Sequence, residues 1–299
     1  MVQPRVLTQD SNDLSQLQRT VIKQMRFTEQ FNRPMTGLVT PFNLGKGERQ
    51  LTLPKGNEFA AKDVEPGIDL VETQDLDPSI VTAVAKRIGM RIVVLDDLAD
   101  QFNEDVFKYI GRAAGEAIGV KQDTDIVSLF SGFSKALGAD NKNLILANAN
   151  ACIAIALGGG ASDLRPFGPA PSVFFVTHPN MLFNLRNELS ITGATYPFPQ
   201  GLNDKLLKNY FARIDISGVS FFHDGNINVI GATASGYGAI FHRGALGLLR
   251  AQQLQTRRTR DESLFAVEIV WSMRYGAFEL DDVRGASTRY EIGEPSTAA

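Results

Sequence analysis

One segment in the first half of the sequence predicts a helix much longer than an ordinary globular domain needs. Asn103 is a suitable N-cap with acidic residues in the first turn after it. A continuous helix over residues 103–131 would be about 43 Å long at about 1.5 Å per residue. Apolar residues recur at helical spacing along it, and this predicted stripe is Val106, Ile110, Ala113, Ala114, Ala117 and Ile118.

Glycines at a spacing of four interrupt the same predicted helix. Each costs up to about 1 kcal/mol of helix propensity relative to alanine. A cost repeated at Gly111, Gly115 and Gly119 predicts close backbone packing along one side. The segment is therefore expected to form a long supporting helix that packs against another layer of structure.

The first 34 residues predict an arm. Residues 12–26 have the pattern of a short amphipathic helix, and a single helix of that length is marginal in water. Its stripe must therefore pack on another part of this chain or on a neighbouring copy. The stripe consists of Leu14, Leu17, Val21 and Met25.

Residues 35–95 predict extended strands and turns. Leu51 and Leu53 alternate with polar residues, turn sequences occur at 45–47, 54–57 and 64–67, and residues 80–87 are rich in β-branched side chains. The simplest interpretation is a long hairpin, polar on both faces near its tip. Since an isolated hairpin is marginally stable, partner subunits are expected to clasp it.

The rest of the chain mixes helices and strands. Helices are predicted at 142–156 and 180–189, with a loop at 190–204, and strands at 172–177, 226–229 and 237–242. Residues 222–225 are a hairpin-turn sequence. Every second residue from Phe265 to Tyr275 is apolar or aromatic, and a further strand follows at 288–292.

Composition excludes several classes. The chain has 299 residues, a formal net charge of −3 and one cysteine, Cys152. A disulfide framework and a multi-cysteine zinc site are excluded, and no stretch of about 18 apolar residues could span a membrane. The slightly acidic composition of the chain argues against tight nucleic-acid binding as its main role, because such binding needs an excess of lysine and arginine.

Sequence features that could carry catalysis are weak. Residues 231–238 are rich in glycine but lie between predicted strands, so a turn explains them better than phosphate binding. His178 precedes a proline at a predicted strand–helix junction. His223 and Asp224 belong to a sequence that is typical of a turn. His242 is expected on a strand, and Cys152 in a helix core. We therefore expect no catalytic residue, no cofactor and no metal site.

Two charged runs of mixed sign remain, and both are expected on loops. Arg257, Arg258 and Arg260 precede two acidic residues, while Asp281 and Asp282 precede Arg284. One hypothesis is that the two runs meet across a subunit boundary, where opposed charges set register more than strength.

Several local sequences, in this order, resemble the major capsid proteins of tailed bacteriophages. Residues 50–54 followed by 64–67 resemble the hairpin segment of that family, and 92–98 resemble its approach to the spine helix. Residues 173–179 resemble the strand and helix of its axial domain. Residues 238–246 and 275–282 resemble the strands that close the axial domain and the peripheral domain.

This resemblance, which covers nearly the whole chain, implies an α+β fold of the Hong Kong 97 type. The implied parts are an N-terminal arm (1–34), an extended loop (35–95), and a peripheral-domain segment with the spine helix (96–137). An axial domain (138–247) and the closing peripheral strands (248–299) follow. Some relatives crosslink a lysine to an asparagine, and Lys55, Lys62 and Lys86 lie near the extended loop, but nothing in the sequence supports that chemistry.

The resemblance implies a structural subunit of the virion capsid, assembled in the host cytoplasm. Copies would form hexamers and pentamers of an icosahedral head that encloses DNA without binding it tightly. A portal protein and separate scaffolding and decoration proteins are the implied partners. The alternatives are an encapsulin-like compartment shell and a cytoplasmic α/β enzyme using residues 231–238 with His223 or His242. The predicted subunit-interface residues are Leu14, Leu17, Val21, Lys55, Lys62, Glu65, Arg257, Arg258, Asp281, Asp282 and Arg284.

Overall fold

The computed structural model describes residues 34–45, 47–55, 63, 79–96, 104–159, 166–169, 172–195, 214–227, 229–230 and 234–294. The predicted arm helix at 12–26 lies outside these residues. The first half contains η1 (Met35–Gly37), β1 (Thr40–Asn43), β2 (Gln50–Lys55), β3 (Ser79–Val84), β4 (Lys86–Leu95), α3 (Glu104–Val127), η2 (Ser128–Gly132), β5 (Ala136–Gly138) and α4 (Leu146–Gly158). The second half contains β6 (Val173–Thr177), α5 (Pro179–Thr195), β7 (Ile214–Ile216), β8 (Val219–His223), β9 (Val229–Ile230), β10 (Ser235–His242), β11 (Leu246–Asp261), β12 (Ala266–Glu279), η4 (Asp282–Arg284) and β13 (Gly285–Glu291).

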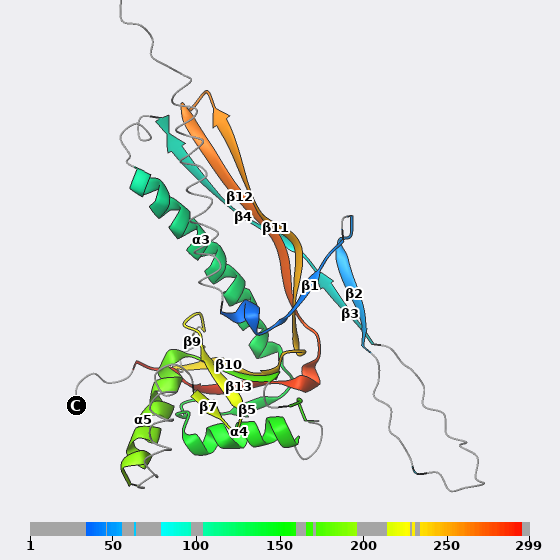
Figure 1. The fold of residues 1–299 in the computed structure, drawn as a ribbon, viewed down its shortest axis with the longest axis vertical. Coiled ribbons are helices and arrows are strands. Elements are labelled where there is room, and N and C mark those ends of the chain that lie inside the picture. The colour runs from blue at the N-terminus through cyan, green and yellow to red at the C-terminus, as the bar shows by residue number, and fades with distance from the viewer. Residues whose placement is uncertain are drawn as a thin grey trace, which may run out of the picture.

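A four-stranded sheet and the helix α3 run side by side along the upper part of the molecule (Figure 1). The strand order is β1-β11-β12-β4. Residues of β12 alternate between buried and half-buried because one face of the sheet packs against α3. Trp271 is fully buried in this core. The Tyr275 hydroxyl donates a hydrogen bond of 2.6 Å to Asp125 Oδ2 on α3, which fixes the helix to the sheet.

A second sheet forms the lower lobe and separates two cores. Its order is β5-β13-β10-β6-β8-β7, and β9 pairs with β10. On one face Phe175 and Ile240 pack against α4 and α5. On the other face Val176 and Phe241 join the core beneath α3 and η2. The strands β6 and β10 are therefore buried on both faces, as their continuous apolar sequences require.

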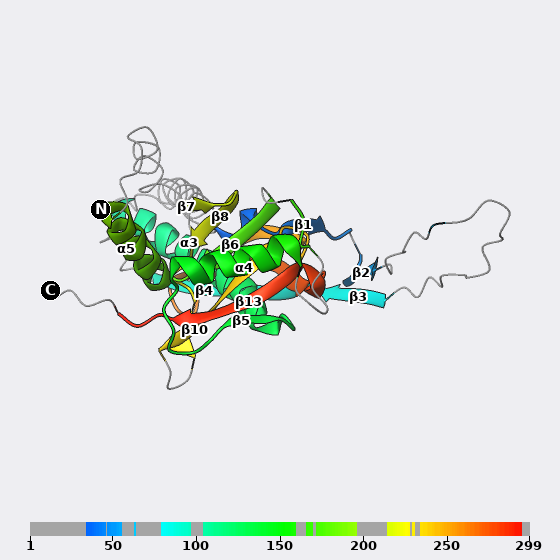
Figure 2. The ribbon, with the colours of Figure 1, turned by 90° about the horizontal axis from the view of Figure 1, so that it is seen from below.

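The strands β2 and β3 form a separate antiparallel hairpin that projects from the body (Figures 1 and 2). A small apolar cluster attaches it to β11 and β12, made by Ala83, Leu249 and Phe278 among others. A Cβ atom at Gly276 would lie 2.4 Å from the carbonyl oxygen of Val84. Glycine at that position lets the end of β3 pass close to β12.

The predicted long helix is confirmed, with a shorter regular part. It spans Glu104–Val127 and is about 36 Å long, and a 3-10 turn continues it over 128–132. All three glycines, at 111, 115 and 119, are buried, so they do mark a packing side. The stripe was wrong at Ala113 and Ala117, which are exposed. The buried face of the helix contains the glycines and the residues three and four positions from them. Alanines are too small and too weakly apolar to indicate by themselves which face of a helix is buried.

Other predicted elements differ in their bounds. The sequence at 222–225 does form a turn, but β8 and β9 on either side of it do not pair. The hairpin joins β7 and β8 instead, through Ser217 and Gly218, both of which have positive φ. The expected strand at 80–87 is split between β3 and β4, and α5 continues to Thr195 into the expected loop.

Candidate interaction surfaces

Charged side chains gather where the β2–β3 hairpin meets the end of β12. Lys55, the last residue of β2, places its Nζ 2.7 Å from Asp281 Oδ1. The second oxygen of Asp281 lies 3.1 Å from Arg284 Nε. Asp282 Oδ1 accepts a hydrogen bond of 2.8 Å from the backbone N–H of Ser134, which follows η2. This group of residues, the hairpin-root cluster, joins the hairpin, β12 and the entry to β5.

Glu279 also belongs to the hairpin-root cluster, and its carboxyl group has a raised pKa. Partial burial first, and then the neighbouring Asp282 carboxylate, to which it is hydrogen-bonded, raise the pKa of Glu279 to about 7. Lys55 opposes this effect and Asp281 adds to it. Near neutral pH, Glu279 can therefore keep its proton, which removes one negative charge from a crowded group of carboxylates.

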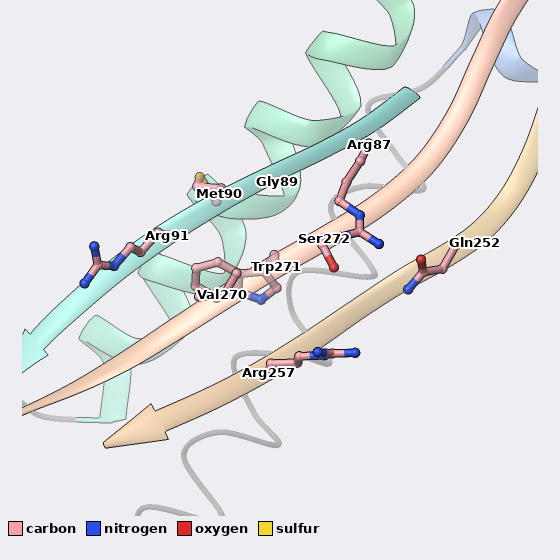
Figure 3. Close-up of a pocket in the computed structure, with 9 residues that line it drawn as sticks. All are labelled: Arg87, Gly89, Met90, Arg91, Gln252, Arg257, Val270, Trp271 and Ser272. Atoms are coloured by element: carbon pink, nitrogen blue, oxygen red, sulfur yellow. The ribbon is translucent and has the colours of Figure 1, made fainter. Parts of the chain in front are cut away.

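A second charged surface lies on the face of the four-stranded sheet that is turned away from α3. Residues of β4 alternate, so Ile88 and Met90 face the helix side while Arg87, Gly89 and Arg91 face outward. An open hollow of about 570 Å³ lies on this outer face (Figure 3). Its lining residues are Arg87, Gly89, Met90, Arg91, Gln252, Arg257, Val270, Trp271 and Ser272.

The hollow has a local structural cause. The pairing of β11 with β12 shifts register between Arg250 and Gln252 and again between Gln252 and Gln255. Such irregularities bend a strand away from its partner. Gly89 adds no side chain on the other side, and a Cβ there would lie 2.9 Å from the Trp271 carbonyl oxygen. Figure 3 shows Arg87 lying across β12 toward Ser272, with Gln252 and Arg257 on the far strand.

Among the interface residues predicted from sequence, Lys55, Asp281 and Arg284 are brought together, and Asp282 lies beside them. The expectation that Arg257 and Arg258 lie on a loop was wrong, because both belong to β11. Arg257 is opposite Val270, whereas Asp281 follows the end of β12, so the two charged runs do not meet within the chain. The pairing of β11 with β12 decides this, and a local charge run does not reveal that pairing. The remaining predicted residues, Leu14, Leu17, Val21, Lys62 and Glu65, lie outside the described residues.

The residues weighed for catalysis do not form a reactive site in the described part of the chain. His223 is exposed at the end of β8, and Asp224 beside it is buried, with Oδ1 accepting from the N–H of Asn226. Burial raises the pKa of Asp224 and lowers that of His178, whose Nδ1 accepts from Asn180 N. His242 Nδ1 accepts a hydrogen bond from the N–H of Gly244.

The glycine-rich run and the cysteine also have structural roles. Residues 235–238 belong to β10 and pair with β13, which removes the loop that an anion would need, while 231–233 lie outside the described residues. Cys152 is buried in α4, where its Sγ lies 3.4 Å from Tyr290 Oη, as expected of a core residue. Within the described ranges, no group of three histidine, cysteine or acidic residues could hold a metal ion, and no helix is long and apolar enough to cross a membrane.

Sequence reasoning missed Glu279, Arg87 and Arg91. The signal available for the two arginines was the alternation of polar and apolar residues over 86–95, which places both on one face of a strand. Glu279 had no such signal. Its neighbours Lys55 and Asp282 come from the hairpin and from the segment after β12, so only the fold brings Lys55 to it.

Comparisons with known proteins give matches in structure alone. No family profile matches the sequence, and no curated protein matches it. A capsid structure of Helicobacter pylori bacteriophage KHP30 is similar with a TM-score of 0.67 at 10% identity, over 87% of this chain and 92% of that one. A structure from Mycobacterium phage Che8 is similar at 0.61 and 17% identity, over 81% and 84% of the chains. The capsid of a native GTA particle is similar at 0.65 and 12% identity, over 86% and 90%.

These similarities extend over most of each chain, so they concern the whole arrangement of sheets and helices. The mixed helix and sheet fold described above is the fold of those matched chains.

Proposed function

We propose that the chain is a major capsid protein, the repeating structural subunit of a phage head. The observation that carries the proposal is the match of the whole fold to phage capsid chains, with 86% of this chain and 88% of the matched chain covered in a further Helicobacter pylori phage head at a TM-score of 0.66. The same fold can carry different functions, which depend on specific sites. The proposal therefore also needs support from the surfaces of this chain.

The projecting hairpin gives that support. Two strands without a third are marginally stable in water, and β2 and β3 pair with each other alone among the described strands. Among the described residues, the apolar cluster beneath the hairpin has four buried members, Ala83, Ala85, Leu249 and Phe278. Contacts with neighbouring copies would stabilise such a projection. Interfaces between permanent partners commonly bury more than about 2,000 Å².

The Hong Kong 97-type details belong to the same proposal. In it, α3 is the spine helix, β11, β12 and β4 form the peripheral domain, and the lobe built around β10 is the axial domain. The proposed division keeps the expected segments 1–34, 35–95, 96–137, 138–247 and 248–299, except that β13, near the end of the last segment, belongs to the axial sheet. The strand β13 pairs with β10 and β5, so the chain returns to the axial sheet after β12.

The proposed partners follow from the assembly. Copies of this chain form hexamers and pentamers in the virion capsid, with a portal protein at one vertex and separate scaffolding and decoration proteins where the phage uses them. The head encloses double-stranded DNA without tight binding, which fits a net charge of −3. No feature of the described residues favours a protein-cargo shell or an α/β enzyme.

Electron microscopy of the purified full chain tests the proposal. The protein is expressed alone and together with its neighbouring gene products, and the products are separated by sedimentation. Closed shells with local five-fold and six-fold vertices are the expected result. A protein that stays monomeric at every concentration, with each of those gene products present, would overturn the proposal. Shells that contain a folded enzyme in place of DNA in infected cells would favour the compartment alternative.

A further inference from the structure

The hairpin-root cluster lies between two different attachments at the end of β12. On one side, Lys55 Nζ lies 2.7 Å from Asp281 Oδ1 and attaches the β2–β3 hairpin. On the other side is η4, the turn through which the chain passes from the four-stranded sheet to β13 of the second sheet. Asp281 Oδ1 accepts a hydrogen bond of 3.3 Å from Val283 N, and Asp282 Oδ1 accepts one of 2.8 Å from Ser134 N. The cluster can therefore act on the hairpin and on the turn.

The charges of the cluster balance when one of its carboxyl groups holds a proton. The cluster has two cationic side chains, Lys55 and Arg284, and three carboxyl groups, Glu279, Asp281 and Asp282. With all three carboxyl groups ionised its net charge is −1, and with one of them protonated its net charge is zero. Carboxylates that lie close together disfavour one another's ionisation, so the arrangement favours the bound proton.

Glu279 is the carboxyl group that interacts with both attachments. It is hydrogen-bonded to Asp282 on the side of the turn, and Lys55 acts on its charge from the side of the hairpin. On its remaining sides, Glu279 is opposite Leu246 of β11, and a Cβ at Gly132 of the uncharged η2 would lie 3.6 Å from its Oε2. Burial first, and then Asp282, raise the pKa of Glu279 to about 7, so the proton leaves near neutral pH.

The two protonation states of Glu279 favour different partners. A protonated Glu279 donates a hydrogen bond to Asp282, which ties the end of β12 to η4. An ionised Glu279 repels Asp282 and attracts the ammonium group of Lys55. Linkage is reciprocal: because the nearby Lys55 lowers the pKa of Glu279, loss of the proton strengthens the attachment of Lys55.

We propose that Glu279 is a proton-controlled switch that holds η4 through Asp282 when it is protonated and holds the β2–β3 hairpin through Lys55 when it is ionised. As the pH rises, the strengthened attachment changes from the connection between the two sheets to the hairpin. The switch is a property of the single chain, so it operates whether or not copies assemble. Global stability still falls with rising pH, because burial, the larger effect, opposes ionisation of Glu279 in the folded protein.

Amide hydrogen exchange of the full chain tests the switch, with the protein kept dilute and unassembled at about pH 5.5 and about pH 8.5. Rates are corrected for the intrinsic effect of pH on exchange. Between the two conditions, protection of residues 281–284 is expected to fall and protection of β2 and β3 to rise. Each change should be about two- to fivefold, the size that partly exposed charge pairs give.

Glu279→Gln is the decisive variant. Its side-chain amide can still donate to Asp282 but cannot ionise, so both pH trends should disappear. Glu291→Gln, the same substitution at a half-buried position of β13, is the matched control and should keep both trends. Equal pH responses in the natural chain and in Glu279→Gln would overturn the inference. A natural chain in which the turn and the hairpin change in the same direction contradicts it too, because the cluster then loosens or tightens as a whole.

A carbon-13 NMR titration of the carboxyl groups gives a second measurement that does not depend on the folding of Glu279→Gln. In the variant Lys55→Met, the pKa of Glu279 is expected to rise above its value of about 7 in the natural chain, because Lys55 lowers it. An equal or lower value in Lys55→Met means that Glu279 does not act on the hairpin, and the inference then fails.

Discussion

Lys55 at the end of β2 and Asp281 after the end of β12 form an ion pair in which Nζ and Oδ1 are 2.7 Å apart. The two residues are separated by most of the chain, yet they fix the root of the projecting hairpin to the body. The same Asp281 also holds Arg284, so a single carboxylate orients both the hairpin and the turn that leads into β13.

The substitution Lys55→Met is expected to loosen the hairpin without unfolding the protein. Both partners are partly exposed, so the global free energy of unfolding should change by less than about 1 kcal/mol. Amide hydrogen exchange in β2 and β3 should accelerate up to about fivefold, because the hairpin opens locally. Lys121→Met, which breaks a more exposed ion pair with Asp125 on α3, is the control and should leave exchange in the hairpin unchanged. Equal hairpin exchange in both variants would contradict the role of Lys55.

Glu279 is expected to make stability depend on pH. Its pKa is raised from 4.5 to about 7 in the folded protein, first by partial burial and then by Asp282, so the folded state holds a proton that the unfolded state releases at lower pH. This contribution to stability is complete below about pH 4.5 and is lost as the pH rises to about 7. The midpoint of thermal unfolding should therefore fall more steeply over that window in the natural protein than in Glu279→Gln.

The comparison needs the same substitution at a glutamate outside the hairpin-root cluster. Glu291→Gln changes a half-buried glutamate of β13 and measures what the loss of a carboxylate alone does to thermal stability. If the midpoints of thermal unfolding of Glu279→Gln and of the natural chain change in parallel from pH 4.5 to 7.5, Glu279 does not hold the proton.

Gly276→Ala is expected to destabilise the protein through the junction of β3 and β12. The new Cβ would lie 2.4 Å from the Val84 carbonyl oxygen, which is backbone and has to move. Overpacking of this kind costs about 1–3 kcal/mol. Urea denaturation measures the change, and Gly37→Ala, where a Cβ meets nothing within 4 Å, should stay within about 0.5 kcal/mol. A midpoint for Gly276→Ala equal to that of Gly37→Ala would show that β3 does not approach β12 so closely.

Tyr275→Phe is expected to weaken the attachment of α3 to the sheet. Tyr275 is almost fully buried, and the lost hydroxyl donates a hydrogen bond of 2.6 Å to Asp125 Oδ2. Loss of a hydrogen bond to a charged acceptor costs about 1.5–3 kcal/mol. The control is Tyr237→Phe, which keeps the ring below the Arg289 guanidinium group and should change little. Chemical denaturation that gives the same free energy for both variants would contradict the contact.

The sequence alone determined the elements that depend on local periodicity. The long helix was predicted because residues 103–131 carry an apolar repeat and a glycine repeat, and its glycines are indeed buried. The strand from Phe265 onward was predicted because side chains alternate along it, and β12 spans Ala266–Glu279. Such patterns are set by neighbours a few residues apart, so they are visible before folding.

Only the tertiary structure decided which of these elements share a surface. Arg257 and Arg258 were expected on a loop because charge runs favour solvent, but pairing with β12 extends β11 to Asp261. Lys55 reaches Asp281, and Arg87 lies on the same face as Arg257, because strand pairing brings distant segments together. Local sequence carries no record of these contacts, since register and sheet order depend on the burial of whole faces.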